Sequence, residues 1–334
     1  MEKKIIIIIF IIVGLFLAIV GPIGFFKAYK YYYSLPYKIP EGKIIFTSNR
    51  LNKNGFSMHI LEDGKIQNSR GGLKPRFIRS TGETVSWGGI GDNALDITDK
   101  HFLMVKKLDF TEKLKIYDFD ISPDGKSLCF TSRLKLNNPD LKQNPSNLFV
   151  VNMDGTNLKQ LTNLKIEYLW MTSYPRWSPD GNRIVFEYVT NENAEKSPAI
   201  SIFSINADGS NLKDLIGDSA TFKGLRVDPA WSPDGGKIAF VTYKDMKDVY
   251  NIYVMNADGT DVTRITDSPY VKRQPVFSPD GTQICYVGYS HGISNGGQLF
   301  IVDLKTKKEY RVTKPGRVKA WPGKVDDRDP DWHE

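Results

Sequence analysis

The tetrad Ser-Pro-Asp-Gly recurs four times in this chain of 334 residues, and no other feature restricts its fold so strongly. The aspartates of the four copies are 56, 54 and 46 residues apart: Asp124, Asp180, Asp234 and Asp280. Each copy follows an apolar or aromatic residue and precedes a short run of β-forming residues. Because proline and the Asp-Gly pair favour tight turns, each tetrad is predicted to join two antiparallel strands. These aspartates and the glycines after them are therefore interpreted as structural turn residues: Gly125, Gly181, Gly235 and Gly281.

A second motif follows the tetrad at a regular distance. Residues 150–155, 203–209 and 253–259 each alternate in polarity, end in Asp-Gly and give way to another apolar run, at 158–162, 212–216 and 262–266. This pattern predicts a second hairpin in each unit. One repeat therefore consists of four short antiparallel strands in roughly 50 residues, which is typical of a β-propeller blade.

Two degenerate copies upstream, around 42–64 and 75–87, bring the number of units to six. The last residues, 329–332, read as the first strand of a repeat, and the segment from Pro40 begins with the second strand of one. We expect residues 329–334 to close a blade with residues 40–70, which would remove the exposed sheet edges. Cys129 and Cys285 then fall in opposite blades, too far apart for a disulfide, and are predicted to be buried free thiols.

The N-terminus carries an uninterrupted apolar stretch over residues 5–26. At 1.5 Å per residue it spans about 33 Å, enough to cross a bilayer core. The sequence predicts a cytoplasmic tail (1–4), a transmembrane signal-anchor helix (5–26), a linker (27–39) and an extracytoplasmic propeller (40–334) at the cell membrane. A cleaved signal peptide is the alternative, and it would make the propeller secreted or periplasmic.

Charge and motif searches narrow the function classes. The net charge is +7, but 45 basic and 38 acidic residues are interleaved, so nucleic-acid binding is not expected. The chain has no G-x-S-x-G, H-E-x-x-H, Walker A or C-x-x-C motif, and its four histidines lie in different repeats. No enzyme activity, metal site or cofactor is therefore predicted, and the oligomeric state is left open.

The repeats, including P-R-W-S-P-D-G at 175–181 and M-N-A-D-G-T-D at 255–261, resemble the WD-like repeats of the TolB-type β-propeller family, also called PD40 repeats. The resemblance covers about residues 40–334 and implies an all-β, six-bladed propeller of four-stranded antiparallel blades. It also implies protein interaction in the cell envelope. The N-terminal α/β domain found in TolB has no counterpart here, since only about a dozen residues separate the apolar segment from the first repeat.

In a propeller of this kind, the short turns gather on one face, and the long loops and inter-blade crossings gather on the other. The loop-rich face carries the candidate binding residues: Tyr168, Trp170, Tyr174, Arg226, Asp228, Tyr270, Arg273, His291 and Arg328. Variable loops on a rigid scaffold are where binding residues concentrate. The leading hypothesis is a membrane-anchored, non-catalytic module that binds a protein or peptide. The alternative is a propeller that binds or cleaves envelope polysaccharide, as a lyase or hydrolase, with Arg226, Asp228 and His291 at the channel mouth.

Overall fold

A computed structural model describes most of the repeat region. The described residues are 35–48, 56–68, 73–87, 94–99, 101, 103–108, 114, 116–132, 146–164, 172–189, 200–217, 225–242, 250–289, 296–314 and 326–334. The predicted membrane segment, residues 5–26, lies outside them. Within these ranges no helix is long and apolar enough to cross a membrane.

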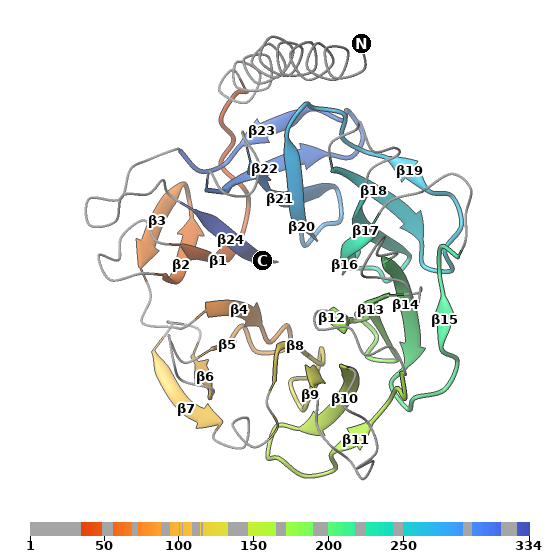
Figure 1. Ribbon diagram of the computed structural model, residues 1–334. Coiled ribbons are helices and arrows are strands. Elements are labelled where there is room, and N and C mark those ends of the chain that lie inside the picture. The colour runs from red at the N-terminus through yellow and green to blue at the C-terminus, as the bar shows by residue number, and fades with distance from the viewer. Residues whose placement is uncertain are drawn as a thin grey trace, which may run out of the picture.

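The described strands form six four-stranded antiparallel sheets arranged as blades around a central axis (Figure 1). This confirms the predicted six-bladed, all-β architecture. Blade 1 contains β24 (Asp327–His333), β1 (Lys43–Ser48), β2 (Ser57–Glu62) and β3 (Lys65–Asn68). Blade 2 contains β4 (Leu73–Phe77), β5 (Thr84–Trp87), β6 (Leu95–Thr98) and β7 (Met104–Leu108). Blade 3 contains β8 (Asp118–Ile121), β9 (Ser127–Ser132), β10 (Asn147–Asn152) and β11 (Lys159–Gln160).

The three remaining blades follow the same order from the axis outward. Blade 4 contains β12 (Thr172–Trp177), β13 (Arg183–Val189), β14 (Ile200–Asn206) and β15 (Lys213–Asp214). Blade 5 contains β16 (Val227–Trp231), β17 (Lys237–Thr242), β18 (Asn251–Asn256) and β19 (Thr263–Arg264). Blade 6 contains β20 (Val271–Phe277), β21 (Gln283–Tyr289), β22 (Gln298–Asp303) and β23 (Glu309–Arg311). The fourth strands of blades 3 to 5 have two residues each, shorter than the apolar runs that predict them.

Blade 1 is built from both ends of the repeat region. The C-terminal strand β24 pairs antiparallel with β1, with Lys43 opposite His333 and Ser48 opposite Asp327. The indole Nε1 of Trp332 donates to the carbonyl of Glu41 at 2.7 Å. The ring is thus held shut by hydrogen bonds between segments about 290 residues apart in sequence.

The tetrad folds into a tight turn for reasons visible in its side chains. In blade 4, Ser178 Oγ donates to Asp180 at 2.5 Å, and the same carboxylate accepts the backbone N–H of Asn182 at 3.0 Å. Gly181 takes a positive φ of 71°, which glycine adopts without steric cost. The serine hydrogen bond is the main reason that the pKa of Asp180 is lowered. The turn aspartates of blades 3, 5 and 6 accept the same two hydrogen bonds.

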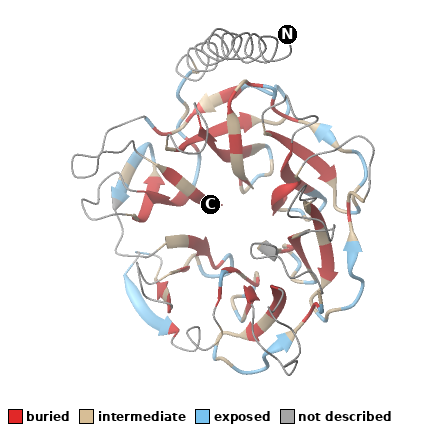
Figure 2. Cartoon of the chain, viewed as in Figure 1, coloured by how far each residue is buried: buried red, intermediate tan, exposed pale blue. Residues whose placement is uncertain are grey.

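The hydrophobic core is divided among the six seams between neighbouring blades, which hold the buried segments in Figure 2. Trp177, Trp231 and Trp332 each pack in such a seam. Cys129 in blade 3 and Cys285 in blade 6 are buried free thiols, which confirms the prediction from the repeat register. The seam between blades 1 and 2 has the smallest described cluster, only three residues.

Candidate binding site in the central channel

Six inner strands, one from each blade, surround the central channel: β4, β8, β12, β16, β20 and β24 (Figure 1). Five of them have a residue with positive φ directly before a proline: Lys74, Tyr174, Asp228, Gln274 and Asp329. In these five inner strands, the pairing register with the neighbouring strand shifts at this point. Non-glycine residues rarely adopt this conformation, so surrounding contacts must hold it in place.

Hydrogen bonds that run from blade to blade supply those contacts. The backbone N–H of Tyr174 donates to Asp118 at 3.3 Å, and that of Gln274 donates to Asp228 at 2.9 Å. The backbone N–H of Asp329 donates to the side-chain oxygen of Gln274 at 2.9 Å, and the Gln274 amide returns a bond to Asp329 at 2.7 Å. A side chain of one blade thus fixes the strained backbone of the next. We call this set of contacts the channel belt.

Asp228 is the most heavily engaged residue of the channel belt. Its side chain is 1% exposed and accepts the Arg273 guanidinium at 2.5 and 3.1 Å. Its own backbone N–H donates to Glu187 at 2.5 Å. Burial, together with the neighbouring Asp228 charge, raises the pKa of Glu187 to about 8, so this carboxyl group is largely protonated at neutral pH. One carboxylate, one carboxylic acid and one guanidinium therefore share the space between blades 4, 5 and 6.

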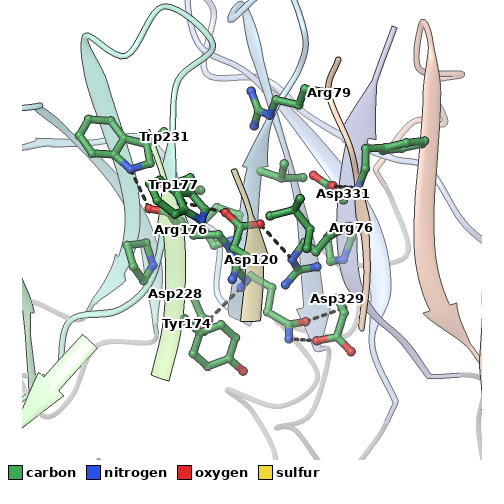
Figure 3. Close-up of a pocket in the computed structure, with 18 of the residues that line it drawn as sticks. Arg76, Arg79, Asp120, Tyr174, Arg176, Trp177, Asp228, Trp231, Asp329 and Asp331 are labelled. Carbon is green, nitrogen blue, oxygen red and sulfur yellow. Dashed lines mark hydrogen bonds and ion pairs between the residues drawn. The ribbon is translucent and has the colours of Figure 1, made fainter. Parts of the chain in front are cut away.

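A second set of charged residues lies two positions further along four inner strands: Arg76, Asp120, Arg176 and Asp331 (Figure 3). Asp120 and Asp331 accept the backbone N–H groups of the next blade at 2.8 and 2.7 Å. Burial is the largest influence on the pKa of Asp120 and raises it, although Arg176 and Arg76 oppose the shift. For Asp118, burial is also the largest influence, but Lys74 and the two arginines together outweigh it, and the pKa is lowered.

These residues line a cavity of about 50 Å³ in the channel. It extends from Tyr174 and Asp228 to Arg79 on the side of the turns, and Figure 3 shows Arg79 and Tyr174 at opposite ends. The volume accommodates a few water molecules or one small polar group. The indole N–H of Trp177 is buried in the cavity wall and has no acceptor among the described residues. Among the described residues, the cavity therefore has room for one small polar group.

The channel end on the loop-rich face has partly exposed side chains at the starts of inner strands. Tyr117, directly before β8, is 51% exposed, and its carbonyl accepts the Lys74 ammonium at 3.3 Å. The Arg328 guanidinium lies 4.3 Å from the centre of the Phe56 ring and pairs with Asp326. We call Phe56, Lys74, Tyr117, Arg273 and Arg328 the channel mouth. Tyr117 and Lys74 are not among the candidates predicted from the sequence. Their position just before a turn motif is the one sequence signal that could have indicated them.

The structure brings together only part of the candidate set. Tyr174, Asp228, Arg273 and Arg328 lie along the channel, whereas Tyr168, Trp170 and His291 lie outside the described residues. Tyr270 is a core residue rather than part of a rim: it is 2% exposed, and its hydroxyl donates to buried Glu309 at 3.2 Å. The apolar seam between blades 5 and 6 covers its ring.

Two residues of the enzymatic alternative, Arg226 and Asp228, are buried, and the third, His291, lies outside the described residues. Arg226 is 6% exposed, and the Asp228 carboxylate is occupied by Arg273 and Gln274. Among the residues that the structure describes, no three His, Cys, Asp or Glu side chains are grouped to hold a metal ion.

Comparisons with known proteins agree with the repeat pattern. A family model described as the TolB beta propeller domain matches residues 129–329. A protein TolB homolog from Chlorobium luteolum is 30% identical over 153 residues, which cover 46% of this chain and 30% of the relative. The aligned part spans less than a third of the length of the first curated relatives.

Solved structures share the fold. The crystal structure of TolB from Acinetobacter baumannii matches with a TM-score of 0.60 and 18% identity, over 90% of this chain and 69% of that chain. An oligogalacturonate lyase from Vibrio parahaemolyticus matches with a TM-score of 0.54 and 16% identity, over 84% of this chain and 78% of that chain. At these identities, the matches show the fold alone.

Proposed function

The chain belongs to the TolB beta-propeller domain family, and from this premise we propose that it binds a protein or peptide partner in the cell envelope. In this proposal, residues 5–26 anchor the propeller in the membrane and residues 40–334 lie on the extracytoplasmic side. The partner contacts the channel mouth on the loop-rich face. The propeller acts by binding, without catalysing a reaction.

The observation that carries the proposal is the channel mouth itself. It combines two exposed or half-exposed cations, Lys74 and Arg328, with an aromatic side chain, Tyr117, that is more than half exposed. Aromatic and arginine side chains are the groups most enriched at protein interfaces. The channel belt beneath them fixes the inner strands, so binding would require little ordering of the backbone.

The cavity below the mouth limits what can enter. With about 50 Å³, it accepts one side chain of a partner and excludes an oligosaccharide, whose rings each need more room. The engaged state of Asp228 and the burial of Arg226 also weigh against the lyase alternative. A protein surface that covers the mouth and inserts a single polar side chain fits these dimensions.

The test is crosslinking in intact cells followed by mass spectrometry, with the native chain and two double variants. Tyr117→Ala with Arg328→Ala removes exposed groups of the mouth. Leu158→Ala with Lys159→Ala removes exposed groups from the outer edge of blade 3 as a matched control. We expect the mouth variant to lose its main crosslinked partner by about tenfold, on the basis of one to two interface residues worth about 1 kcal/mol each. Equal recovery of every partner by all three chains would refute the proposal.

A further inference from the structure

The segment that precedes the first blade is attached to the outer edge of blade 6. Tyr37 forms a parallel bridge with Arg311 of β23, the outermost strand of that blade. The Arg311 N–H donates to the Pro36 carbonyl at 2.7 Å, and the Lys38 N–H donates to the Arg311 carbonyl at 2.8 Å. Figure 1 shows this segment passing along blade 6 before it reaches β1. The chain therefore arrives at the propeller from the rim of blade 6, not from the channel axis.

Cations and tyrosines gather at the same rim. Lys38 and Lys308 each lie 5.3 Å from the centre of the Tyr310 ring. Arg311 and Lys314 lie 5.1 and 5.5 Å from the centre of the Tyr37 ring. We call these residues, together with exposed Lys305 and Lys307, the basic rim.

Acidic groups border one side of the basic rim: Lys38 shares a pocket with Glu41, Asp280 and Glu334. Asp303 lies in the adjoining turn, where the backbone N–H and the hydroxyl of Thr306 are the main reasons that its pKa is lowered. Glu309 is buried and faces the core hydroxyls of Ser268, Tyr270 and Tyr286. Arg311 is 2% exposed, so the exposed positive charge of the rim comes from its lysines, above all Lys305, Lys307, Lys308 and Lys314. Tyr37 is 49% exposed beside them.

We propose that the basic rim rests on the anionic lipid headgroups of the membrane, so that the propeller docks by its edge with the channel axis roughly parallel to the bilayer. Lysines and tyrosines beside a membrane segment are typical of the lipid interface. Ile39, 64% exposed, adds an apolar side chain in the same segment. Only eight residues separate Leu35, the first described residue, from the end of the predicted membrane helix at 26. The lipid surface is thus within reach of the rim, and both channel ends stay accessible to partners.

This inference rests on the proposed anchor, and its test separates the two. The full chain is placed in nanodiscs of phosphatidylcholine alone or with 30% phosphatidylglycerol, with an acceptor dye on the lipid. A donor dye is attached at Thr306→Cys in blade 6 or at Thr156→Cys in the corresponding turn of blade 3, on the opposite side of the ring. Cys129 and Cys285 are fully buried and should stay unlabelled.

Energy transfer from position 306 should be higher in anionic than in neutral nanodiscs, and the difference should vanish in high salt. Transfer from position 156 should stay low in both. Each rim lysine near an anionic surface contributes a factor of about 5 to the docked population. Lys305→Glu with Lys308→Glu should therefore lower the docked-to-undocked ratio at least 25-fold, whereas Lys106→Glu with Lys159→Glu, which changes net charge equally in blades 2 and 3, should not.

Equal transfer in both lipids, or an effect of the control pair as large as that of the rim pair, would overturn the docking proposal. Carbonate extraction of cell membranes tests the anchor separately. The ratio of energy transfer in anionic nanodiscs to that in neutral ones can be measured whether or not residues 5–26 span the bilayer. The rim test therefore remains valid if the anchor proposal fails. If the rim test fails while a partner still crosslinks to the mouth of the native chain, the binding function stands and only the orientation is refuted.

Discussion

Replacing Asp228 with asparagine tests the channel belt at its most connected residue. The carboxylate oxygens accept two bonds from Arg273 and one from the Gln274 backbone. Asparagine tolerates the positive φ of 57° and keeps one acceptor, but its amide N–H₂ would face a guanidinium donor. Removing one partner of a buried ion pair costs about 3 to 5 kcal/mol. Because the Arg273 side chain is 24% exposed, the lower end of about 3 kcal/mol is expected.

The assay is thermal unfolding of the full chain in detergent at pH 6, followed by tryptophan fluorescence. For the propeller of residues 40–334, a loss of about 3 kcal/mol lowers the Tm by roughly 5 °C, since the unfolding entropy is about 2.1 cal/mol/K per residue. The decrease in Tm should become smaller toward pH 9. Without the Asp228 charge, Glu187 ionises more easily and can pair with Arg273 in its place. Asp208→Asn, in an exposed turn, is the control and should leave the Tm nearly unchanged. A Tm drop below about 2 °C, or one shared by the control, would refute the reasoning on the belt.

Three further predictions concern ionisation, closure and burial. The pKa of Glu187 is raised in the folded state to about 8, so its contribution to stability is fully present below the unfolded value of 4.5 and is lost as the pH rises through 8. Glu187→Gln should therefore flatten the fall of the urea midpoint between pH 5 and 8, and an unchanged slope would contradict this. Gly42→Ala should destabilise the ring by more than the ~1 kcal/mol of positive φ alone, since a Cβ would lie 2.3 Å from a carbonyl of β24. Gly82→Ala, with a similar φ and open space, supplies the matched comparison, and equal unfolding midpoints would argue against a tight closure. Native protein should show no thiol reactive with a maleimide and two after unfolding, because Cys129 and Cys285 are fully buried and burial raises the pKa of both.

The blades could be predicted from the sequence because their information is local. Each Ser-Pro-Asp-Gly tetrad contains the hydroxyl, carboxylate and glycine that build its own turn, as Ser178, Asp180 and Gly181 show. Repetition at about 50 residues then specifies the ring. The short outer strands were less predictable, since two-residue pairing at Lys159–Gln160 leaves little periodic signal.

The channel belt could not be predicted, because its contacts join residues more than 40 positions apart. Asp228, Glu187 and Arg273 come from three blades, and no spacing rule links them. Tyr270, by contrast, was predicted to lie on the binding face but is buried. An aromatic residue in a crossing segment is indistinguishable by sequence from an exposed one, but its hydroxyl finds Glu309 inside a seam. The proline after five of the inner-strand residues is the one sequence signal of the belt.

A photo-crosslinking amino acid at position 117 tests the central claim, that the channel mouth receives a protein partner, most directly. Its side chain is exposed at the start of β8, so the substitution should leave the fold intact. The same group at Leu212, exposed on the outer edge of blade 4, is the control. After irradiation of intact cells, we predict one discrete protein adduct from position 117 and none of that mass from position 212. No adduct at 117, or the same adduct from both positions, would contradict the proposed function.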